Sequence, residues 1–458
     1  MRKKLTAVCL SVLLALTLAA CSETGPAGGE IEYPVYADDR EVLLSAYMNP
    51  WQCTDEQYQW VQESGLNHLY INRSSNENAD TMRSAIEMCE KYGIKTIPMT
   101  CWGSPFEDSK SFDQYPIDMH EYPGFSGFNI MDEPKYEDFD ALAAEYQKYQ
   151  VAYPDAVFYT NLLRPGGSKS NLSYAKNVPY DKYISTFVEK VIAPITGKKT
   201  MSVTLYPLLI DVVTGQKSVQ VTHLNDLGTF ALAAQGAGAE MYHFVQSMSF
   251  GYNNGNPHHL PSEADIRFQI YSGMAFGAKG WQYFTYATPN ASYEFTASDY
   301  GMINRDNKRT SVYYGVQQVN SEITKFDHVF LRFDWRATML VDGAKAETEN
   351  PGFELFRSND SYPLVDSTEA LAAAQASQDT LIGVLNDGER DGYVVVNYTH
   401  PSYDLSDEIS LSFPDARAVI VYIDGEEHRF TRDDEQFKRG VLTITLDPGE
   451  GIFVIPVA

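Results

Sequence analysis

Cationic side chains are scarce in this chain of 458 residues, which has 35 Lys and Arg against 61 Asp and Glu and a formal net charge of −26. A surface this negative repels phosphate backbones, so the charge balance argues against nucleic acid as a partner. Cysteine is also rare, and Cys53, Cys89 and Cys101 are the three that follow Cys21. None of them stands in a CxxC or Cys/His metal spacing. We therefore expect neither a metal nor a cofactor.

Histidine gives no metal pattern either. His68, His223 and His243 are scattered along the chain, and His243 falls in the middle of a predicted strand, where we expect a satisfied interior histidine. The pair His258-His259 lies in a segment rich in Gly, Asn and Pro. That composition favours a solvated loop, although such a loop could also reach the edge of a binding site.

Long apolar runs are missing beyond the N-terminus, and no later run approaches the ~20 apolar residues that a membrane-spanning helix needs. At the start, Arg2, Lys3 and Lys4 precede the apolar run 5–18, and Leu-Ala-Ala-Cys then ends at Cys21. This order is typical of a bacterial lipoprotein signal peptide over residues 1–21, with Cys21 as the lipidated residue. An ordinary cleaved signal with an incidental cysteine is the alternative. Residues 22–38 read as a flexible tether, so we expect a membrane-anchored lipoprotein of the cell envelope, in contact with the membrane through its lipid alone.

Residues 39–327 alternate between strand-like apolar runs and helix-like segments. The number and spacing of these pairs predict a (β/α)8 TIM barrel. A doubly wound open sheet is the competing fold, but no Gly-rich phosphate loop follows the first strand. Two helix starts are marked by their capping residues, Thr54 in one case and Ser262 with Asp265 in the other. The expected strands are 43–47, 66–71, 94–99, the segment around 127–132, 157–160, 200–209, 240–245 and 278–285.

Residues 328–458 show a different pattern, with short apolar or alternating runs that begin at Val329–Phe333. Asn386-Asp387-Gly388 and Asp424-Gly425 supply the turn residues between several of these runs. The pattern predicts a C-terminal antiparallel β-sandwich that supports the barrel, and we see no catalytic chemistry in it.

The segment Gly127–Pro134, which reads GFNIMDEP, carries the strongest functional signal. Phe128, Ile130 and Met131 suit a buried strand, and a proline cannot continue the hydrogen-bond ladder. The strand should therefore end with Asp132 and Glu133 at its carboxyl edge, which is where barrels mount their catalytic groups. Partial burial at such an edge raises the pKa of a glutamic acid toward neutrality and suits it to proton transfer. A solvated loop that happens to contain these residues is the alternative.

Other strand ends would share the same edge, and the side chains expected there are mostly aromatic rings and amides. Rings stack on the apolar faces of sugars, while amides and carboxylates hydrogen-bond their hydroxyls. The set therefore favours a neutral carbohydrate as substrate. The expected substrate-binding residues are Trp51, Asn72, Trp102, Asp132, Asn161, Tyr206, Gln246 and Tyr286.

With strand four ending in Asp132-Glu133, Tyr206 on strand six and GAKGWQYFTYATP at strand eight, the chain resembles clan A glycoside hydrolases of the beta-galactosidase type. The resemblance implies that Glu133 is the general acid/base. In that clan an Asn usually precedes this Glu, and Asp132 replaces it here. The clan's nucleophile is a second Glu after strand seven, and this chain has Gln246 at that position, which cannot act as a carboxylate nucleophile.

Glycoside hydrolysis ordinarily uses two carboxyl groups, so the second one must come from elsewhere. Asp211 is our first choice, followed by Glu294 and then Asp299. We expect a lipid-anchored glycoside hydrolase that acts on neutral oligo- or polysaccharides. A non-catalytic glycan-binding lipoprotein on a degenerate barrel is the main alternative, and a purely scaffolding envelope protein is a more distant one.

Overall fold

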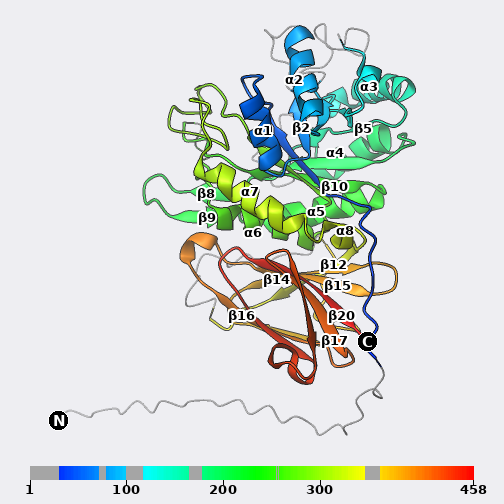
Figure 1. The fold of residues 1–458 in the computed structure, drawn as a ribbon, viewed down its shortest axis with the longest axis vertical. Helices are drawn as coiled ribbons and strands as arrows, with labels where there is room; N and C mark the ends of the chain where they lie inside the picture. Colours follow the sequence, from blue (N-terminus) through cyan, green and yellow to red (C-terminus); the bar gives the residue numbers. More distant parts are fainter. Residues whose placement is uncertain are drawn as a thin grey trace, which may run out of the picture.

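The computed structural model of the protein describes residues 30–71, 79–99, 117–164, 178–253, 255, 257–345 and 362–458. Parallel strands surrounded by helices form one half of the molecule, and antiparallel strands form the other (Figure 1). From residue 30 the chain runs along the side of the antiparallel half before it enters the first parallel strand (Figure 1).

The parallel half is built on a seven-stranded sheet in the order β3-β2-β1-β11-β10-β7-β6. Further contacts close this sheet into a barrel: β4 and β5 pair in parallel, Met99 after β3 bridges Asn129 after β4, and Asp132 bridges Asn161. The strands are β1 (Leu43–Tyr47), β2 (His68–Ile71), β3 (Lys95–Pro98), β4 (Gly127–Phe128), β5 (Val157–Phe158), β6 (Asn161–Leu162), β7 (Thr200–Thr204), β10 (Glu240–Gln246) and β11 (Gly280–Phe284).

Helices follow these strands and cover the outside of the barrel. Thr54 caps the first of them by accepting a hydrogen bond from the backbone N–H of Gln57, and Ser262 and Asp265 form the predicted capping box of α6. The helices are α1 (Asp55–Glu63), α2 (Ala79–Lys91), α3 (Phe139–Ala152), α4 (Tyr180–Phe187), α5 (His223–Gly236), α6 (Glu263–Ala275), α7 (Ser311–Ile323) and α8 (Asp327–Phe330). The predicted (β/α)8 fold class is thereby confirmed.

Two segments differ from the sequence prediction. The expected strand 200–209 ends as β7 at Thr204, and a separate hairpin of β8 (Leu208–Ile210) and β9 (Lys217–Val219) follows it. Pro207 stands between β7 and β8 and has no N–H to continue a ladder. The expected strand Val329–Phe333 is also wrong, because its first residues belong to helix α8. A short apolar run fits a buried helix as well as a buried strand.

Aromatic side chains fill much of the barrel interior. Tyr47, Tyr70, Tyr159, Tyr242 and Phe244 are buried there in one cluster. The rings of Tyr47 and Tyr70 lie 6.1 Å apart, and those of Tyr159 and Tyr242 are stacked at the same distance. The barrel is thus packed below its carboxyl edge, and any cavity for a ligand must lie at the strand ends.

The C-terminal half is the predicted antiparallel β-sandwich, with a six-stranded sheet in the order β12-β14-β15-β20-β17-β18 and a three-stranded sheet in the order β13-β16-β19. Alternate side chains of the two sheets meet in a second buried cluster that contains Ile382, Val395 and Leu411. The strands are β12 (Asp334–Val341), β13 (Ala373–Ala376), β14 (Thr380–Asn386), β15 (Asp391–Asn397), β16 (Asp407–Ser412), β17 (Ala418–Ile423), β18 (Glu426–Thr431), β19 (Val441–Leu446) and β20 (Gly451–Val457).

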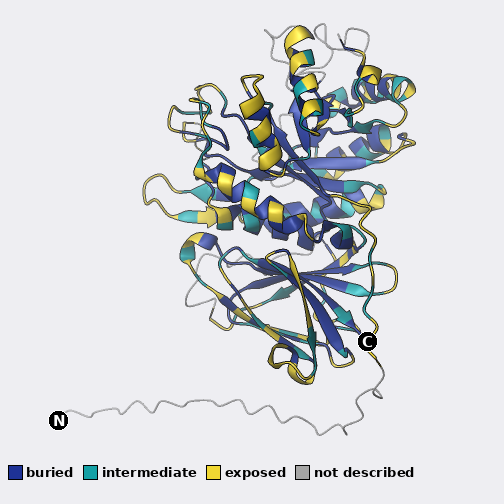
Figure 2. Cartoon of the chain, viewed as in Figure 1, coloured by how far each residue is buried: buried dark blue, intermediate teal, exposed yellow. Residues whose placement is uncertain are grey.

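Helix α6 joins the two halves. Its residues are buried almost throughout, and the helix lies against the six-stranded sheet (Figure 2). A Cβ added at Gly383 of β14 would lie 2.2 Å from the carbonyl oxygen of Ala275, and one at Gly451 of β20 would lie 2.4 Å from the ring of Tyr271. Glycine at these positions lets the sheet approach the helix closely, so the barrel and the sandwich share one continuous core.

Several predictions concern residues outside the described ranges: the signal peptide with Cys21, residues 22–29 of the tether, and the sites predicted at Asn72 and Trp102. No helix within the described ranges is both long enough and apolar enough to cross a bilayer.

Candidate active site

A cavity of about 370 Å³ opens at the carboxyl edge of the barrel strands. Side chains from several strand ends and from the loop after β11 line it. Aromatic rings and carboxylates dominate the lining, and no described lining residue is a Lys, Arg or His. The lining residues are Tyr47, Met48, Trp51, Asp132, Glu133, Asn161, Thr204, Tyr206, Phe244, Phe250, Phe284, Pro289, Glu294 and Phe295.

Glu133 is held in the cavity by contacts with two neighbouring strands. Its backbone N–H donates to the carbonyl of Asn161 at 2.9 Å, and its Oε1 accepts a hydrogen bond from the hydroxyl of Thr204 at 3.1 Å. Its φ angle is +47°, a left-handed conformation that is uncommon for a residue other than glycine. Such a conformation costs free energy, and residues that keep one cluster at functional sites.

Asn161 links the two adjacent acids. Its side-chain amide donates to Oδ1 of Asp132 at 3.1 Å and to the hydroxyl of Thr204 at 2.6 Å. Thr204 then donates to Glu133, so a continuous hydrogen-bond chain runs from Asp132 through Asn161 and Thr204 to Glu133. This network fixes the positions of both carboxyl groups from the ends of β6 and β7.

Burial raises the pKa of Glu133 well above the usual range of a glutamic acid. The negative charge of Asp132, and to a smaller extent that of Glu294, raises this pKa further, whereas the hydrogen bond from Thr204 opposes the shift. Burial also raises the pKa of Asp132, against the effect of its hydrogen bond from Asn161. A carboxyl group that keeps its proton near neutral pH can serve as a general acid.

Glu294 supplies another carboxyl group to the same cavity from the loop after β11. The residue as a whole is exposed, yet partial burial of its carboxyl group raises its pKa. The carbonyl of Glu294 accepts a hydrogen bond from the N–H of Gly251 at 3.1 Å, which ties this loop to the segment after β10. Glu294, the second-ranked candidate for the partner of Glu133, thus lines the same cavity as Glu133.

The first choice, Asp211, does not reach the cavity. It is exposed at the turn of the β8–β9 hairpin, where its Oδ1 accepts hydrogen bonds from the N–H groups of Val213 and Thr214 at 2.8 and 2.9 Å. The prediction followed from extending the sixth strand through Pro207. Asp299 is buried and engaged by Ser249 and Thr296, at 2.7 and 2.8 Å, and does not line the cavity either.

The six predicted sugar-binding residues that the structure describes divide into two groups. Trp51, Asp132, Asn161 and Tyr206 line the cavity. The indole N–H of Trp51 donates to the carbonyl of Thr288 at 3.0 Å, which fixes the ring at the cavity wall. Tyr206 packs against Phe284, with ring centres 5.4 Å apart.

Gln246 and Tyr286 are buried elsewhere. The side chain of Gln246 forms hydrogen bonds with backbone groups of neighbouring segments. Its Nε2 donates to the carbonyl of His259 at 2.8 Å, and its Oε1 accepts from the N–H of Leu208 at 3.2 Å. The hydroxyl of Tyr286 donates to the carbonyl of Gln57 at 3.2 Å. Neither side chain lines the cavity, so both act within the protein interior.

Several lining residues escaped the sequence reasoning, among them Thr204, Phe244, Phe250 and Phe295. Thr204 is the last residue of β7, so a correct strand boundary would have placed it at the edge. Phe244 precedes Gln246 by two residues and points to the same face of β10, as strand alternation requires. Phe250 and Phe295 lie in loops, where the sequence gives no register.

The fold is a (β/α)8 barrel with an attached antiparallel sandwich, and the cavity lies at the carboxyl edge of the barrel strands. No protein-family model and no curated protein matches the sequence. Among solved structures, a catalytic mutant of a GH42 beta-galactosidase from G. stearothermophilus matches with a TM-score of 0.56 at 9% identity, over 93% of this chain and 99% of that one.

The beta-galactosidase from Bacillus circulans sp. alkalophilus also matches with a TM-score of 0.56, at 7% identity, over 91% of this chain and 99% of the other. The cold-adapted beta-galactosidase from Rahnella sp. R3 matches with a TM-score of 0.46 at 12% identity, over 67% of this chain, which spans 59% of that enzyme. The first two matches show that this chain shares the fold of these beta-galactosidases, the type of enzyme that the sequence resembles.

Proposed function

We propose that the protein is a glycoside hydrolase in which Glu133 is the general acid/base and Glu294 is the second carboxylate. The single observation that supports this most directly is the position of Glu133. It lies in a ring-lined cavity at the carboxyl edge of the barrel, with a raised pKa and a hydrogen bond from Thr204. The fold shared with beta-galactosidases supports the same chemistry at the level of the scaffold.

In the proposed reaction, Glu133 donates its proton to the glycosidic oxygen as the bond from that oxygen to the anomeric carbon breaks. Positive charge develops on the sugar ring, and the carboxylate of Glu294 stabilises it by attacking the anomeric carbon or by activating a water molecule. Glu133, now ionised, accepts a proton from water if a covalent intermediate has formed. Asp132 and Asn161, which line the same cavity, would hydrogen-bond the hydroxyls of the bound sugar.

The proposed substrate is a neutral oligo- or polysaccharide. Trp51, Tyr206 and Phe295 line the cavity with aromatic rings, and the lining has carboxylates without a described cation to balance them. A phosphorylated or carboxylated sugar would meet like charges there. We further propose that lipidation at Cys21 anchors the enzyme to a membrane of the bacterial envelope, with the barrel facing outward.

Hydrolysis of a panel of neutral aryl glycosides by the purified protein tests this function. We expect the wild type to hydrolyse at least one glycoside. In Glu133→Gln the turnover rate on that glycoside should fall by a factor on the order of 10² or more. Binding of glycans in a calorimeter without turnover of any glycoside would instead show the non-catalytic alternative. Full activity in Glu133→Gln would remove Glu133 from the mechanism.

A further inference from the structure

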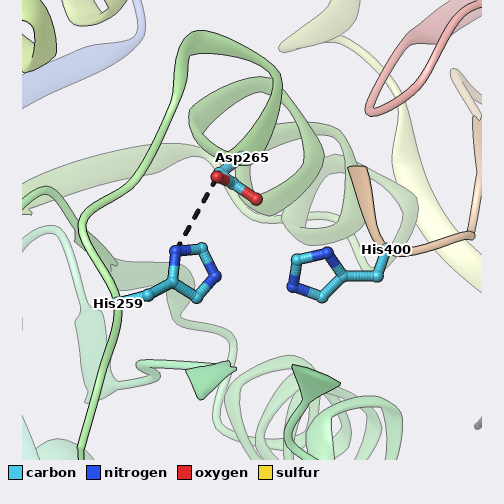
Figure 3. A group of neighbouring side chains, drawn as sticks. All are labelled: His259, Asp265 and His400. Carbon is cyan, nitrogen blue, oxygen red and sulfur yellow. Dashed lines mark ion pairs between the residues drawn. The ribbon is translucent and has the colours of Figure 1, made fainter. Parts of the chain in front are cut away.

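A second cluster of chemically active side chains lies between the barrel and the sandwich, apart from the cavity. His259 comes from the loop after β10, Asp265 from the first turn of α6, and His400 from the loop after β15. All three are buried, with exposures of 2%, 1% and 0%. One nitrogen or oxygen atom from each lies within 4.8 Å of the others. Figure 3 shows the two imidazole rings turned toward each other, with the carboxylate of Asp265 beside them.

Each of these side chains uses one polar atom to bind its own loop and directs the other into the cluster. Nδ1 of His259 donates to the carbonyl of Leu260 at 3.0 Å, and Oδ2 of Asp265 accepts from the N–H and hydroxyl of Ser262 at 2.9 and 2.8 Å. Nδ1 of His400 contacts the N–H and hydroxyl of Ser402 at 3.0 and 2.8 Å. Nε2 of both histidines and Oδ1 of Asp265 find no hydrogen-bond partner among the described residues.

Buried polar atoms without partners are costly, and a set of three that converge on one point requires an explanation. Two imidazole nitrogens and one carboxylate oxygen form a ligand set that suits zinc and related divalent ions.

We propose that His259, Asp265 and His400 bind a divalent transition-metal ion, with Zn²⁺ as the first candidate, through Nε2, Oδ1 and Nε2 respectively. Ligand bonds of about 2.0–2.2 Å in a tetrahedral site place the ligand atoms about 3.3–3.6 Å apart. The three side chains, whose ligand atoms lie within 4.8 Å of one another, would therefore have to close in by up to about 1.5 Å when the ion binds. Water would complete the tetrahedral coordination. With two ligands from the barrel and one from the sandwich, the ion would fasten the two halves of the molecule together.

Metal coordination through Nε2 requires that both histidines have their proton on Nδ1. His259 already has its proton on Nδ1, because that atom donates to Leu260. In His400, Nδ1 accepts from the N–H of Ser402, which places the proton on Nε2. Metal binding through Nε2 would require this proton on Nδ1, which could then donate a hydrogen bond to the hydroxyl of Ser402 at 2.8 Å, while the backbone N–H of Ser402 would give up its bond to Nδ1. No proton is released overall, and Ser402 becomes the residue that holds His400 in its ligating form.

The test is metal content and thermal unfolding of the purified protein after incubation with Zn²⁺ and removal of free ion. We expect inductively coupled plasma mass spectrometry to find one equivalent of zinc per chain. The unfolding temperature should fall when a chelator is added and recover when Zn²⁺ is restored. Co²⁺ in its place should give the strong visible absorption bands of a tetrahedral site. His400→Gln and His259→Gln should lose the metal and the response to chelator.

Two further variants keep the result interpretable if a ligand substitution unfolds the protein. Ser402→Ala leaves all three ligands in place and should weaken zinc binding about 10-fold or more, because a partner that orients a ligating histidine is lost. His243→Gln replaces another buried histidine, whose Nδ1 contacts the carbonyl of Phe244 at 3.3 Å, and should keep one equivalent of zinc. A wild-type protein that takes up no Zn²⁺ or Co²⁺, or a His400→Gln protein that keeps its metal, would overturn the proposal.

Discussion

The hydroxyl of Thr204, the last residue of β7, donates a 3.1 Å hydrogen bond to Oε1 of Glu133, which follows β4. This contact joins two strand ends that lie 71 positions apart in the sequence. It stabilises the ionised form of Glu133 and so limits how far burial raises the pKa of this acid. Thr204 is therefore a positioning residue for the proposed acid/base.

Replacement of Thr204 tests this relationship. In Thr204→Val the lost hydrogen bond should raise the pKa of Glu133 further, because its ionised form loses a donor. The alkaline limb of the pH–rate profile should move to higher pH, and kcat should fall several-fold, since the same hydrogen bond orients the carboxyl group. Thr204→Ser keeps the hydroxyl and should retain the wild-type profile. An unchanged alkaline limb in Thr204→Val would show that Thr204 does not act on the titrating group.

The second carboxylate can be identified by comparing two acids. Glu294→Gln should reduce kcat by on the order of 10² or more, because the cavity then lacks the group that stabilises positive charge on the sugar. Asp211→Asn should have wild-type kinetics, since Asp211 is exposed in a hairpin turn. The measurement is kcat and KM on the best aryl glycoside. Equal losses in both variants, or a loss in Asp211→Asn alone, would contradict the assignment of Glu294.

The pKa of Glu133 also predicts how stability depends on pH. Below its ordinary value of 4.5 this acid is protonated in both the folded and the unfolded chain, so it has no effect on the free energy of unfolding. Above that pH the unfolded chain loses the proton first, because burial raises the folded pKa. The unfolded state then binds fewer protons, and stability falls as pH rises until Glu133 ionises in the folded protein.

Glu133→Gln removes this loss. Its unfolding temperature should match that of the wild type at pH 4 and exceed it at pH 8, with a difference in free energy of about 1.4 kcal/mol for each unit by which the pKa is raised. The exposed Glu408 supplies a control, since Glu408→Gln should show no such trend. A wild type that remains the more stable protein at pH 8 would mean that Glu133 is not buried as the structure has it.

Trp51 is expected to act in binding more than in chemistry. Trp51→Ala should raise KM about 3- to 10-fold with little change in kcat, because a ring stacked on a sugar contributes roughly 0.5–1.5 kcal/mol. Trp51→Phe keeps a ring and should show a smaller effect, although it loses the hydrogen bond to Thr288. A change in kcat alone would argue against the role of Trp51 as a binding surface.

The close packing of the sandwich on α6 predicts a stability effect far from the cavity. Gly383→Ala would place a Cβ 2.2 Å from the carbonyl of Ala275 and should lower the free energy of unfolding by about 1–3 kcal/mol. Gly236→Ala, at the end of α5, meets no atom within 4 Å and should be neutral or slightly stabilising. Denaturant unfolding of the two variants measures both effects. Equal stability would mean that the two halves do not pack as tightly as described.

Much of the fold could be predicted from the sequence because it depends on local patterns. The alternation of strands and helices, the cap at Thr54 and the capping box at Ser262 each reflect residues that are close in the chain. The errors arose where a local pattern fits two structures. The run at Val329–Phe333 suits either a helix or a strand. The predicted strand that extended beyond Pro207 led us to expect Asp211 at the edge of the barrel, which it does not reach.

The site could also be predicted only in part, because some of its residues follow local sequence patterns and others lie in loops. Glu133 could be singled out because Pro134 marks the end of the apolar segment that begins with β4, although β4 itself ends at Phe128. Glu294 lies in a loop and could only be ranked among other acids. The buried histidine pair was misread: His258-His259 was expected in a solvated loop, yet both side chains are buried. His400 joins His259 only through the contact between barrel and sandwich, which no spacing in the sequence can show.

The most direct measurement of the central claim is the dependence of kcat/KM on the leaving group, compared between the wild type and Glu133→Ala. If Glu133 donates the proton, the variant should lose on the order of 10² or more on aryl glycosides with basic leaving groups. On dinitrophenyl glycosides, whose leaving groups need no proton, it should lose far less. An equal loss across all leaving groups, or no loss on any, would contradict the proposal that Glu133 is the acid of this enzyme.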